Sequence, residues 1–261
     1  TNSANLTGSG TSTLTLSESN FAGKVNFAST NIYVKTTVFN DSTLLVRSGA
    51  TSSQSWSGGN IFKGVTTISS TYSGGTSHTF TLALDSGDVF EKDVFLNTQT
   101  VTMRAVFKGT TKFYGDVTIN SSKVIFNAGR GIFMCSGEVN QSIGGSAAYL
   151  IGKLHLNKET GTVEMMRSCT IDSSLTLSGG LFQSDSIISL KSPVTTTGSS
   201  ANSFIDGPVN KIGNTAFVFP IGDQGKYRPL AISAPSQATD AFSAQYFYSP
   251  QQAGTSTDTT I

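Results

Sequence analysis

A short pattern of phenylalanine and glycine recurs along the chain and limits what it can fold into. Three segments share the order Phe-x-Gly-x-x-x-apolar, namely FAGKVNF (21–27), FKGVTTI (62–68) and FKGTTKF (107–113). Their first residues lie 41 and 45 residues apart. Such spacing indicates a repeat architecture, in which each unit relies on its neighbour to bury its apolar side.

Each repeat divides into two halves of similar character. After the Phe-Gly segments come VFNDSTLLVRSG (38–49), HTFTLALDSG (78–87) and VIFNAGRGIFMCSG (124–137), which all contain a run of β-formers and end in Ser-Gly. A half-unit of about 20 residues suits one coil of a parallel β-helix, in which each short strand pairs with its counterpart in the next coil.

The remaining pattern indicates an all-β chain. Short alternating runs such as STLTLSES (12–19), NIYVKTTVF (31–39) and SSLTLSGG (173–180) are separated by Gly, Asn, Asp and Ser. We predict a parallel β-helix over residues 1–203, with apolar ladders inside and Ser, Thr and Asn outside. A β-sandwich or a pair of sandwiches is the alternative, because it also uses short strands at regular spacing.

Charge is scarce, which narrows the classes of function. Charged residues make up 13% of the 261 residues, and the formal net charge is +1, whereas soluble proteins typically contain about 25% charged residues. This balance offers no electrostatic footprint for nucleic acid, and no apolar run is long enough to cross a bilayer. We therefore expect no nucleic-acid partner and no membrane insertion.

Candidate groups for chemistry are few. The densest acidic group lies in LDSGDVFEKDVF (84–95) and consists of Asp85, Asp88, Glu91 and Asp93. A solvated turn is the simplest interpretation of this group, and a calcium site or a catalytic carboxylate pair is the alternative. His78 and His155 have no ligand partner at metal-binding spacing. We predict no catalytic residue, no metal ligand and no cofactor.

Two aromatic residues stand in polar loops. Trp56 lies in SSQSWSGG (52–59) and Tyr72 lies in SSTYSGGTS (69–77). Exposed aromatic rings stack on sugars, so both are candidate ligand contacts. For Trp56 the alternative is a side chain folded back onto an exposed side of the helix.

The chain contains two cysteines, Cys135 and Cys169. Two are too few for a disulfide scaffold or a metal cluster. A pair of buried thiols and a single disulfide both remain open from the sequence, the second because the composition suggests an extracellular setting.

The segment FIDGPVNKIGNTAFVFPIGDQGKYRPLAIS (204–233) differs from everything before it. It carries Gly207-Pro208, Lys211, Gly213, Phe217-Val218-Phe219-Pro220-Ile221-Gly222 and Tyr227-Arg228-Pro229. Over these thirty residues it resembles a segment common in large secreted proteins of the Bacteroidota. The Ser/Thr-rich repeats upstream are similar to the body of the same proteins only in style.

The resemblance implies a cellular location and a set of candidate functions for the chain. Such proteins are typically exported by the type IX secretion system and displayed on or released from the cell surface, and they include adhesins and gliding-type surface proteins. We therefore expect a non-enzymatic segment of a longer surface polypeptide, with surface glycans or other outer-membrane proteins as partners. The alternatives are a carbohydrate-binding or polysaccharide-degrading β-helix module, and a subunit of an outer-membrane secretion or motility assembly.

The resemblance also implies O-glycosylation. In these bacteria glycans are attached to Ser or Thr after Asp and before a small, aliphatic or Thr residue. The triplets Asp41-Ser42-Thr43, Asp185-Ser186-Ile187 and Asp258-Thr259-Thr260 fit, so Ser42, Ser186 and Thr259 are the candidate attachment sites.

The same segment predicts how the repeats end. A β-helix has an end with unpaired strand edges and exposed core, and solenoids need a cap there. Phe and Tyr can fill the last coil, and Pro can interrupt further strand pairing. We predict that residues 204–261 form an aromatic, proline-rich cap that leads into a small β-sandwich.

Overall fold

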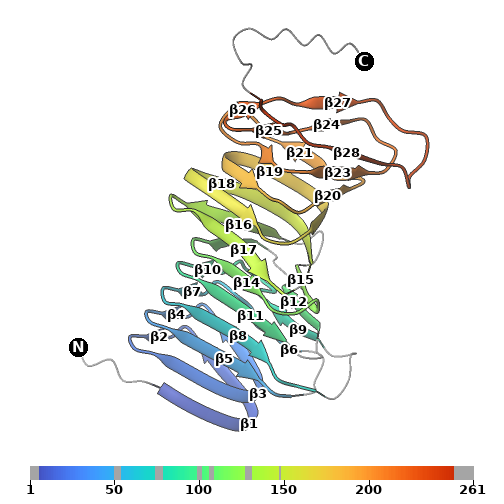
Figure 1. The fold of residues 1–261 in the computed structure, drawn as a ribbon. Coiled ribbons are helices and arrows are strands. Elements are labelled where there is room, and N and C mark those ends of the chain that lie inside the picture. Colours follow the sequence, from blue (N-terminus) through green and yellow to red (C-terminus); the bar gives the residue numbers. More distant parts are fainter. Residues whose placement is uncertain are drawn as a thin grey trace, which may run out of the picture.

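The computed structural model confirms a parallel β-solenoid. It describes residues 6–49, 54–73, 79–98, 102–105, 109–126, 131–146 and 148–249. Within these ranges every regular element is a β-strand, and most strands pair in parallel with a strand of the next coil (Figure 1). The β-sandwich alternative is therefore wrong for the body of the chain.

The coils have three faces, and each face is a ladder of short parallel strands. The first face contains β2 (Asn20–Phe21), β4 (Val38–Phe39), β7 (Ile61–Phe62), β10 (Val89–Phe90), β13 (Thr110–Phe113) and β16 (Ile132–Gly137). The second contains β5 (Thr43–Arg47), β8 (Thr66–Ser70), β11 (Val94–Thr98), β14 (Val117–Ile119) and β17 (Gln141–Gly145). The third contains β6 (Gln54–Ser55), β9 (Thr79–Leu82), β12 (Thr102–Ala105) and β15 (Val124–Phe126).

Longer strands run around the corners at both ends of the stack. Near the N-terminus, β1 (Leu6–Ser17) and β3 (Val25–Lys35) each cover two faces. Further along, β18 (Tyr149–Met165) and β19 (Cys169–Gln183) each contribute to all three. The last parallel strands are β20 (Ile188–Lys191), β21 (Thr195–Thr197), β22 (Ile205–Asp206) and β23 (Val209–Ile212).

A stack of phenylalanine rings fills the interior behind the first face. Phe39, Phe62, Phe90 and Phe113 are in register across successive coils. Neighbouring ring centroids lie 4.8, 4.7 and 5.3 Å apart, with interplanar angles of 2°, 6° and 5°. Phe21 continues the stack 5.3 Å from Phe39. Each such pair adds about 0.5–1.5 kcal/mol to the stability that burial already supplies.

One part of the predicted repeat is out of register. The structure pairs Phe113 through Phe90 with Phe62, so the third copy is FYGDVTI (113–119) and not the segment that begins at Phe107. Phe107 itself lies outside the described residues. Counted from Phe21, successive rungs are separated by 18, 23, 28 and 23 residues. Each interval is one coil, in agreement with the predicted half-unit.

The C-terminal module follows the last coil without a break. The parallel ladder continues through β23, so the boundary expected at residue 203 falls inside that coil. After Ile212 the strands pair antiparallel, and one isolated parallel bridge joins Ile221 to Ile205. The antiparallel strands are β24 (Phe217–Phe219) with β27 (Leu230–Ile232), β25 (Gly222–Asp223) with β26 (Lys226–Tyr227), and β28 (Ala241–Ala244) with β23.

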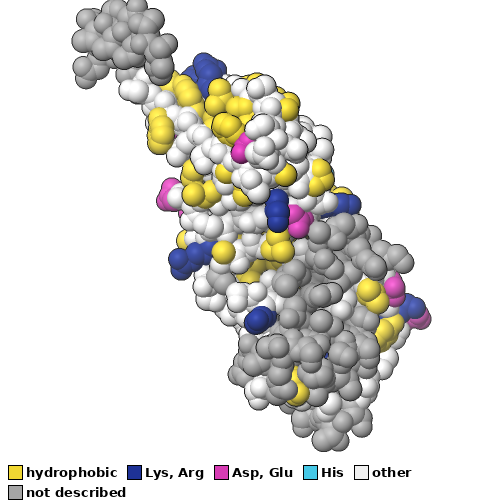
Figure 2. All heavy atoms as spheres, turned by 90° about the vertical axis from the view of Figure 1, so that its right-hand side faces the viewer, with side chains coloured by type: hydrophobic (Ala, Val, Ile, Leu, Met, Phe, Trp, Pro, Cys, Tyr) yellow, Lys and Arg dark blue, Asp and Glu magenta, His cyan; other side chains and the backbone are white. Residues whose placement is uncertain are grey.

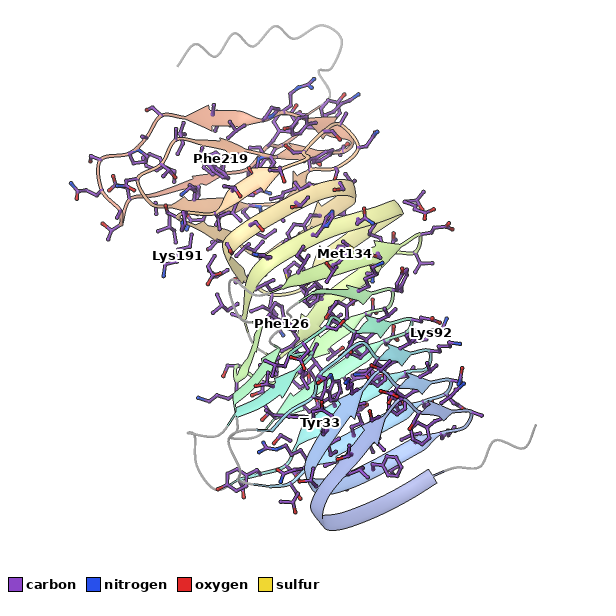
Figure 3. The ribbon with its side chains drawn as sticks, turned by 180° about the vertical axis from the view of Figure 1, so that it is seen from behind. Tyr33, Lys92, Phe126, Met134, Lys191 and Phe219 are labelled. Atoms are coloured by element: carbon purple, nitrogen blue, oxygen red, sulfur yellow. The ribbon has the colours of Figure 1, made fainter. Side chains whose placement is uncertain are left out.

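The aromatic residues of this module pack over the last coil as the cap prediction requires. Phe217 and Phe219 are buried and contact each other edge to face, with centroids 5.1 Å apart. Phe219 is labelled in Figure 3, among the strands of the C-terminal module. Phe204 is also buried and stacks on Tyr227 at 6.0 Å. Lys211 is enclosed as well, and its Nζ donates a hydrogen bond of 2.9 Å to the carbonyl of Ile212. Residues 204–233 therefore cover the C-terminal end of the solenoid.

Candidate functional site

Trp56 and Asp88, which the sequence raised as separate candidates, contact each other inside the fold. The Trp56 Nε1 donates a hydrogen bond of 2.7 Å to Oδ2 of Asp88. Asn60 donates to Oδ1 of the same carboxylate from its backbone N at 2.9 Å and from its side-chain Nδ2 at 3.0 Å. The Asp88 backbone N donates in turn to the Thr111 hydroxyl at 3.1 Å. The network ties three successive coils together at one corner.

Burial determines what this network can do. Trp56 and Asn60 are fully buried and Asp88 is 1% exposed. Burial raises the pKa of Asp88 to about 7, although the hydrogen bonds from Asn60 and Trp56 act in the opposite direction. The prediction that Trp56 contacts a ligand is wrong, because its ring packs 5.9 Å from Phe62 within the core. For Asp88 the solvated-turn interpretation is also wrong.

Tyr72 has a different environment. It follows β8, and its side chain is half-buried against the core. Because the residue is only partly buried, a ligand contact at Tyr72 stays a prediction. Trp56 lies inside the coil, so the two aromatic side chains do not form a shared ligand-binding surface.

An acidic recess opens on the second face near the C-terminal end. It encloses about 320 Å³ and is lined by Glu164, Gln183, Ser184, Asp185 and Asp206. Glu164, Gln183 and Asp206 are successive rungs of one ladder, because β18, β19 and β22 place them in register. The sequence gives no hint of this grouping, since the three residues lie about one coil apart.

Asp206 is the most perturbed carboxyl group of the recess. Burial is the main cause that raises its pKa, and the nearby charges of Asp223 and Asp185 raise it further. Hydrogen bonds from the Gln183 side chain and the Gln224 backbone act against this rise. A recess that combines carboxylates, an amide and a hydroxyl can accept hydrogen bonds from the hydroxyl groups of a sugar.

The remaining candidate for chemistry is His155, which pairs with Ser178. His155 Nε2 lies 2.8 Å from the Ser178 hydroxyl, and partial burial lowers the pKa of the imidazole. A nucleophilic site would need a third group to orient the histidine and donors for an oxyanion. Within the described ranges, no three His, Cys, Asp or Glu side chains are grouped to hold a metal ion.

The structure decides between buried thiols and a disulfide for the two cysteines. Cys135 and Cys169 are both buried free thiols, so the disulfide interpretation is wrong. Burial raises the pKa of each thiol to about 12. They serve as small apolar residues of the first and third faces.

The candidate glycan sites lie at corners of the solenoid. Ser42 is half-buried just before β5, and its hydroxyl donates to the Asp41 carboxylate at 3.3 Å. Ser186 is half-buried between β19 and β20, and its backbone N donates to the Ser184 hydroxyl at 3.0 Å. Thr259 lies outside the described residues. Turns of this kind are where a modifying enzyme can reach a hydroxyl, so attachment at Ser42 and Ser186 stays a prediction.

Comparison with known proteins adds no relative. No protein-family model matches the chain, and no curated protein or solved structure matches it either. In the described part of the chain there is also no helix of the length and hydropathy that a membrane span requires.

Proposed function

We propose that this chain is a non-enzymatic, rod-like segment of a secreted cell-surface protein, of the stalk or adhesin kind. The observation that carries the proposal is the unbroken parallel ladder that ends in an aromatic cap. Through the middle of the stack, successive coils are paired strand to strand on three faces, and the phenylalanine stack runs behind one of them. A body of this construction resists bending, because bending would have to separate paired strands.

The surface suits such a role. Outward positions are mainly Ser, Thr and Asn. On the face seen in Figure 2 the charged side chains are scattered, in places with a Lys or Arg beside an Asp or Glu. Amide side chains link neighbouring coils from outside, as where Asn120 Nδ2 donates to Asn97 Oδ1 at 2.8 Å. A neutral, hydroxyl-rich rod has little attraction for nucleic acid or lipid headgroups and can project from a surface.

Export by a type IX-like route and a position outside the outer membrane belong to the same proposal. They are supported by the resemblance of residues 204–233 to secreted Bacteroidota proteins. The test is to add a protease to intact cells that make the protein and to probe the chain by immunoblot. Loss of the full-length signal while a cytoplasmic marker survives is the expected result. A signal that is lost only after lysis would refute surface display.

A second experiment, co-purification, distinguishes the rod from an assembly subunit. If the protein instead serves as a subunit or cargo of an outer-membrane secretion or motility assembly, it should co-purify with outer-membrane components after gentle solubilisation. A free surface segment should be recovered without them.

Carbohydrate binding is the second candidate, and the recess around Asp206 is the observation that favours it. A glycan array followed by calorimetry on the best oligosaccharide would test it. Replacement Asp206→Asn should weaken binding about tenfold or more, because one charged acceptor is lost. Glu91→Gln, on an exposed corner of the body, is the matched control. Binding that both variants retain would exclude the recess as the site.

A further inference from the structure

The hairpin formed by β25 and β26 packs on β22 of the last coil through a small set of polar contacts. A parallel bridge joins Ile221 to Ile205, and the Ile205 backbone N donates a hydrogen bond of 2.8 Å to the Pro220 carbonyl. At the turn of the hairpin, the Gln224 backbone N donates to the Asp206 carboxylate. Gln224 has a φ of 48°, a left-handed conformation that is uncommon outside glycine. The Asp206 carboxylate therefore anchors the turn.

Carboxylates crowd this junction from the elements packed around Asp206. Glu164 of β18 and Asp185, which follows β19, line the same recess as Asp206. Asp223 belongs to the hairpin itself, and its charge acts on Asp206. Gln183 contributes a neutral side chain that donates a hydrogen bond to Asp206. The hairpin is thus attached at a point where four acidic side chains meet.

The nearby cations are directed to other partners. Lys226 Nζ lies 6.0 Å from the centroid of the Tyr248 ring, and Arg228 Nη1 donates to the preceding backbone carbonyl at 2.9 Å. Lys211 Nζ donates to a backbone carbonyl of its own strand. Asp223 Oδ2 accepts a hydrogen bond of 2.8 Å from the Tyr248 backbone N. In the part of the chain that the structure describes, none of the four carboxylates forms an ion pair, so their repulsion is not neutralised.

We propose that this junction is a pH-dependent latch, in which protonation of Asp206 tightens the hairpin on the last coil and ionisation loosens it. Protonation removes the central charge, so the repulsion from Asp223 and Asp185 falls. The protonated carboxyl keeps an oxygen that accepts the hydrogen bond from the Gln224 backbone N. This inference concerns how the C-terminal module is attached and does not depend on the proposed surface function.

The environment of Asp206 sets the direction of the pH dependence. Burial, followed by the charges of Asp223 and Asp185, raises its pKa above the ordinary value of 3.8 in spite of the two hydrogen bonds. The protonated group therefore stabilises the closed junction. That stabilisation is fully present below pH 3.8 and is lost as the pH rises through the raised pKa. The hairpin is held most firmly in acidic medium.

Hydrogen exchange of the 261-residue chain tests the latch, with a chelator present throughout. The reporter is the Arg228 amide, which donates to the Ile221 carbonyl at 2.9 Å across the hairpin. After correction for the intrinsic pH dependence of exchange, its protection should fall at least about threefold between about pH 4.5 and 7.5. Protection that does not change with pH would overturn the proposal.

Three variants assign the effect to Asp206. Asp206→Asn keeps an oxygen acceptor without the charge, so protection of the Arg228 amide should become independent of pH. Asp223→Asn removes one repelling charge and should raise protection at neutral pH. Glu91→Gln, on an exposed corner of the body, is the matched control and should behave as the wild-type chain. A pH dependence that survives Asp206→Asn would contradict the latch.

Calcium provides a last discrimination at the same amide. The wild-type chain is measured again at neutral pH with calcium chloride in place of the chelator. The proton latch predicts unchanged protection of the Arg228 amide, because no group of acidic side chains in the described residues is arranged to hold a metal ion. Protection that calcium restores to its acidic-pH value would assign the carboxylates to a cation and overturn the proposal.

Discussion

The stacked coils and the C-terminal module use similar residues but bury them to different extents. In the coils, Phe39, Leu45 and Phe62 are fully buried, because a coil lies on each side of them. In the module, β24 alternates buried phenylalanines with Val218, which is 50% exposed, and Phe242 on β28 is 44% exposed. Figure 2 shows hydrophobic side chains gathered at the end of the molecule that carries this module. Burial in this chain therefore depends on how many neighbouring layers a strand has.

The largest expected difference between the two regions comes from removing a ring. Phe62→Ala takes a fully buried side chain out of the middle of the stack and leaves a cavity between Phe39 and Phe90. We expect it to lower the free energy of unfolding by about 3–5 kcal/mol. The measurement is the midpoint of urea unfolding followed by circular dichroism.

The matched control is a phenylalanine of the module. Phe242→Ala removes the same atoms from a partly exposed site, so its cost should be below about 1 kcal/mol. Equal losses for the two variants would show that the module is packed as tightly as the coils and would remove the distinction drawn above.

Glycine provides a sharper version of the same comparison. At Gly64 an added Cβ would lie 2.3 Å from the carbonyl carbon of Asp41 and 2.4 Å from the backbone N of Ser42, in the adjacent coil. Gly64→Ala should therefore cost about 3 kcal/mol, the upper end of the usual overpacking cost, because the backbones of two coils must separate. Gly225 in the module has a positive φ of 73° and no atom within 4 Å of an added Cβ. Gly225→Ala should cost only about 1 kcal/mol of backbone strain.

Thermal melting of both glycine variants beside the wild-type chain gives the answer. A Gly64→Ala protein as stable as Gly225→Ala would mean that the coils yield easily to extra volume, against the close approach seen at this corner.

The remaining expected effect is a dependence of stability on pH that arises within the coils, at Asp88. Asp88 titrates near 3.8 when unfolded, and burial raises its pKa to about 7 in the fold. Between these values the folded chain retains a proton that the unfolded chain has lost. The stabilisation that this proton gives the folded chain is fully present below pH 3.8 and is lost as the pH rises through about 7. The free energy of unfolding falls by about 1.4 kcal/mol for each pH unit in this interval.

Urea unfolding of the wild-type chain and Asp88→Asn at several pH values between about 4 and 8 isolates this contribution. The difference in unfolding free energy between the two proteins should change with the stated slope. A constant difference would show that the three hydrogen bonds keep Asp88 ionised throughout.

The class of fold was predictable because its signals are local. Alternating β-formers, Ser-Gly turns and recurring Phe-Gly segments all report the length of one coil. The register was harder, since FKGTTKF and FYGDVTI both fit the pattern and begin only six residues apart at Phe107 and Phe113. The pairing of β10 with β13 places Phe113 in register with Phe90, which sets the register of this coil.

The buried Trp56–Asp88 network and the acidic recess were less predictable, because the residues of each belong to different coils. A tryptophan among Ser and Gly suggests exposure, but Asp88, which binds Trp56, lies 32 residues further on. The rungs Glu164, Gln183 and Asp206 likewise meet only when the coil lengths between them are known. The cap was recognisable from sequence, because it is compact and its aromatics lie close together in the chain.

The unequal spacing of the phenylalanine rungs has a consequence for how such a chain can change. Intervals of 18, 23, 28 and 23 residues all return to the same ring position, because the corners absorb the difference. The sequence of one whole coil can therefore be duplicated or deleted between two equivalent phenylalanine rungs, and the strand ladders are preserved. Each such event would lengthen or shorten the molecule by about 4.8 Å, the distance between neighbouring strands. Reach could thus be adjusted in small, regular steps while both ends stay the same.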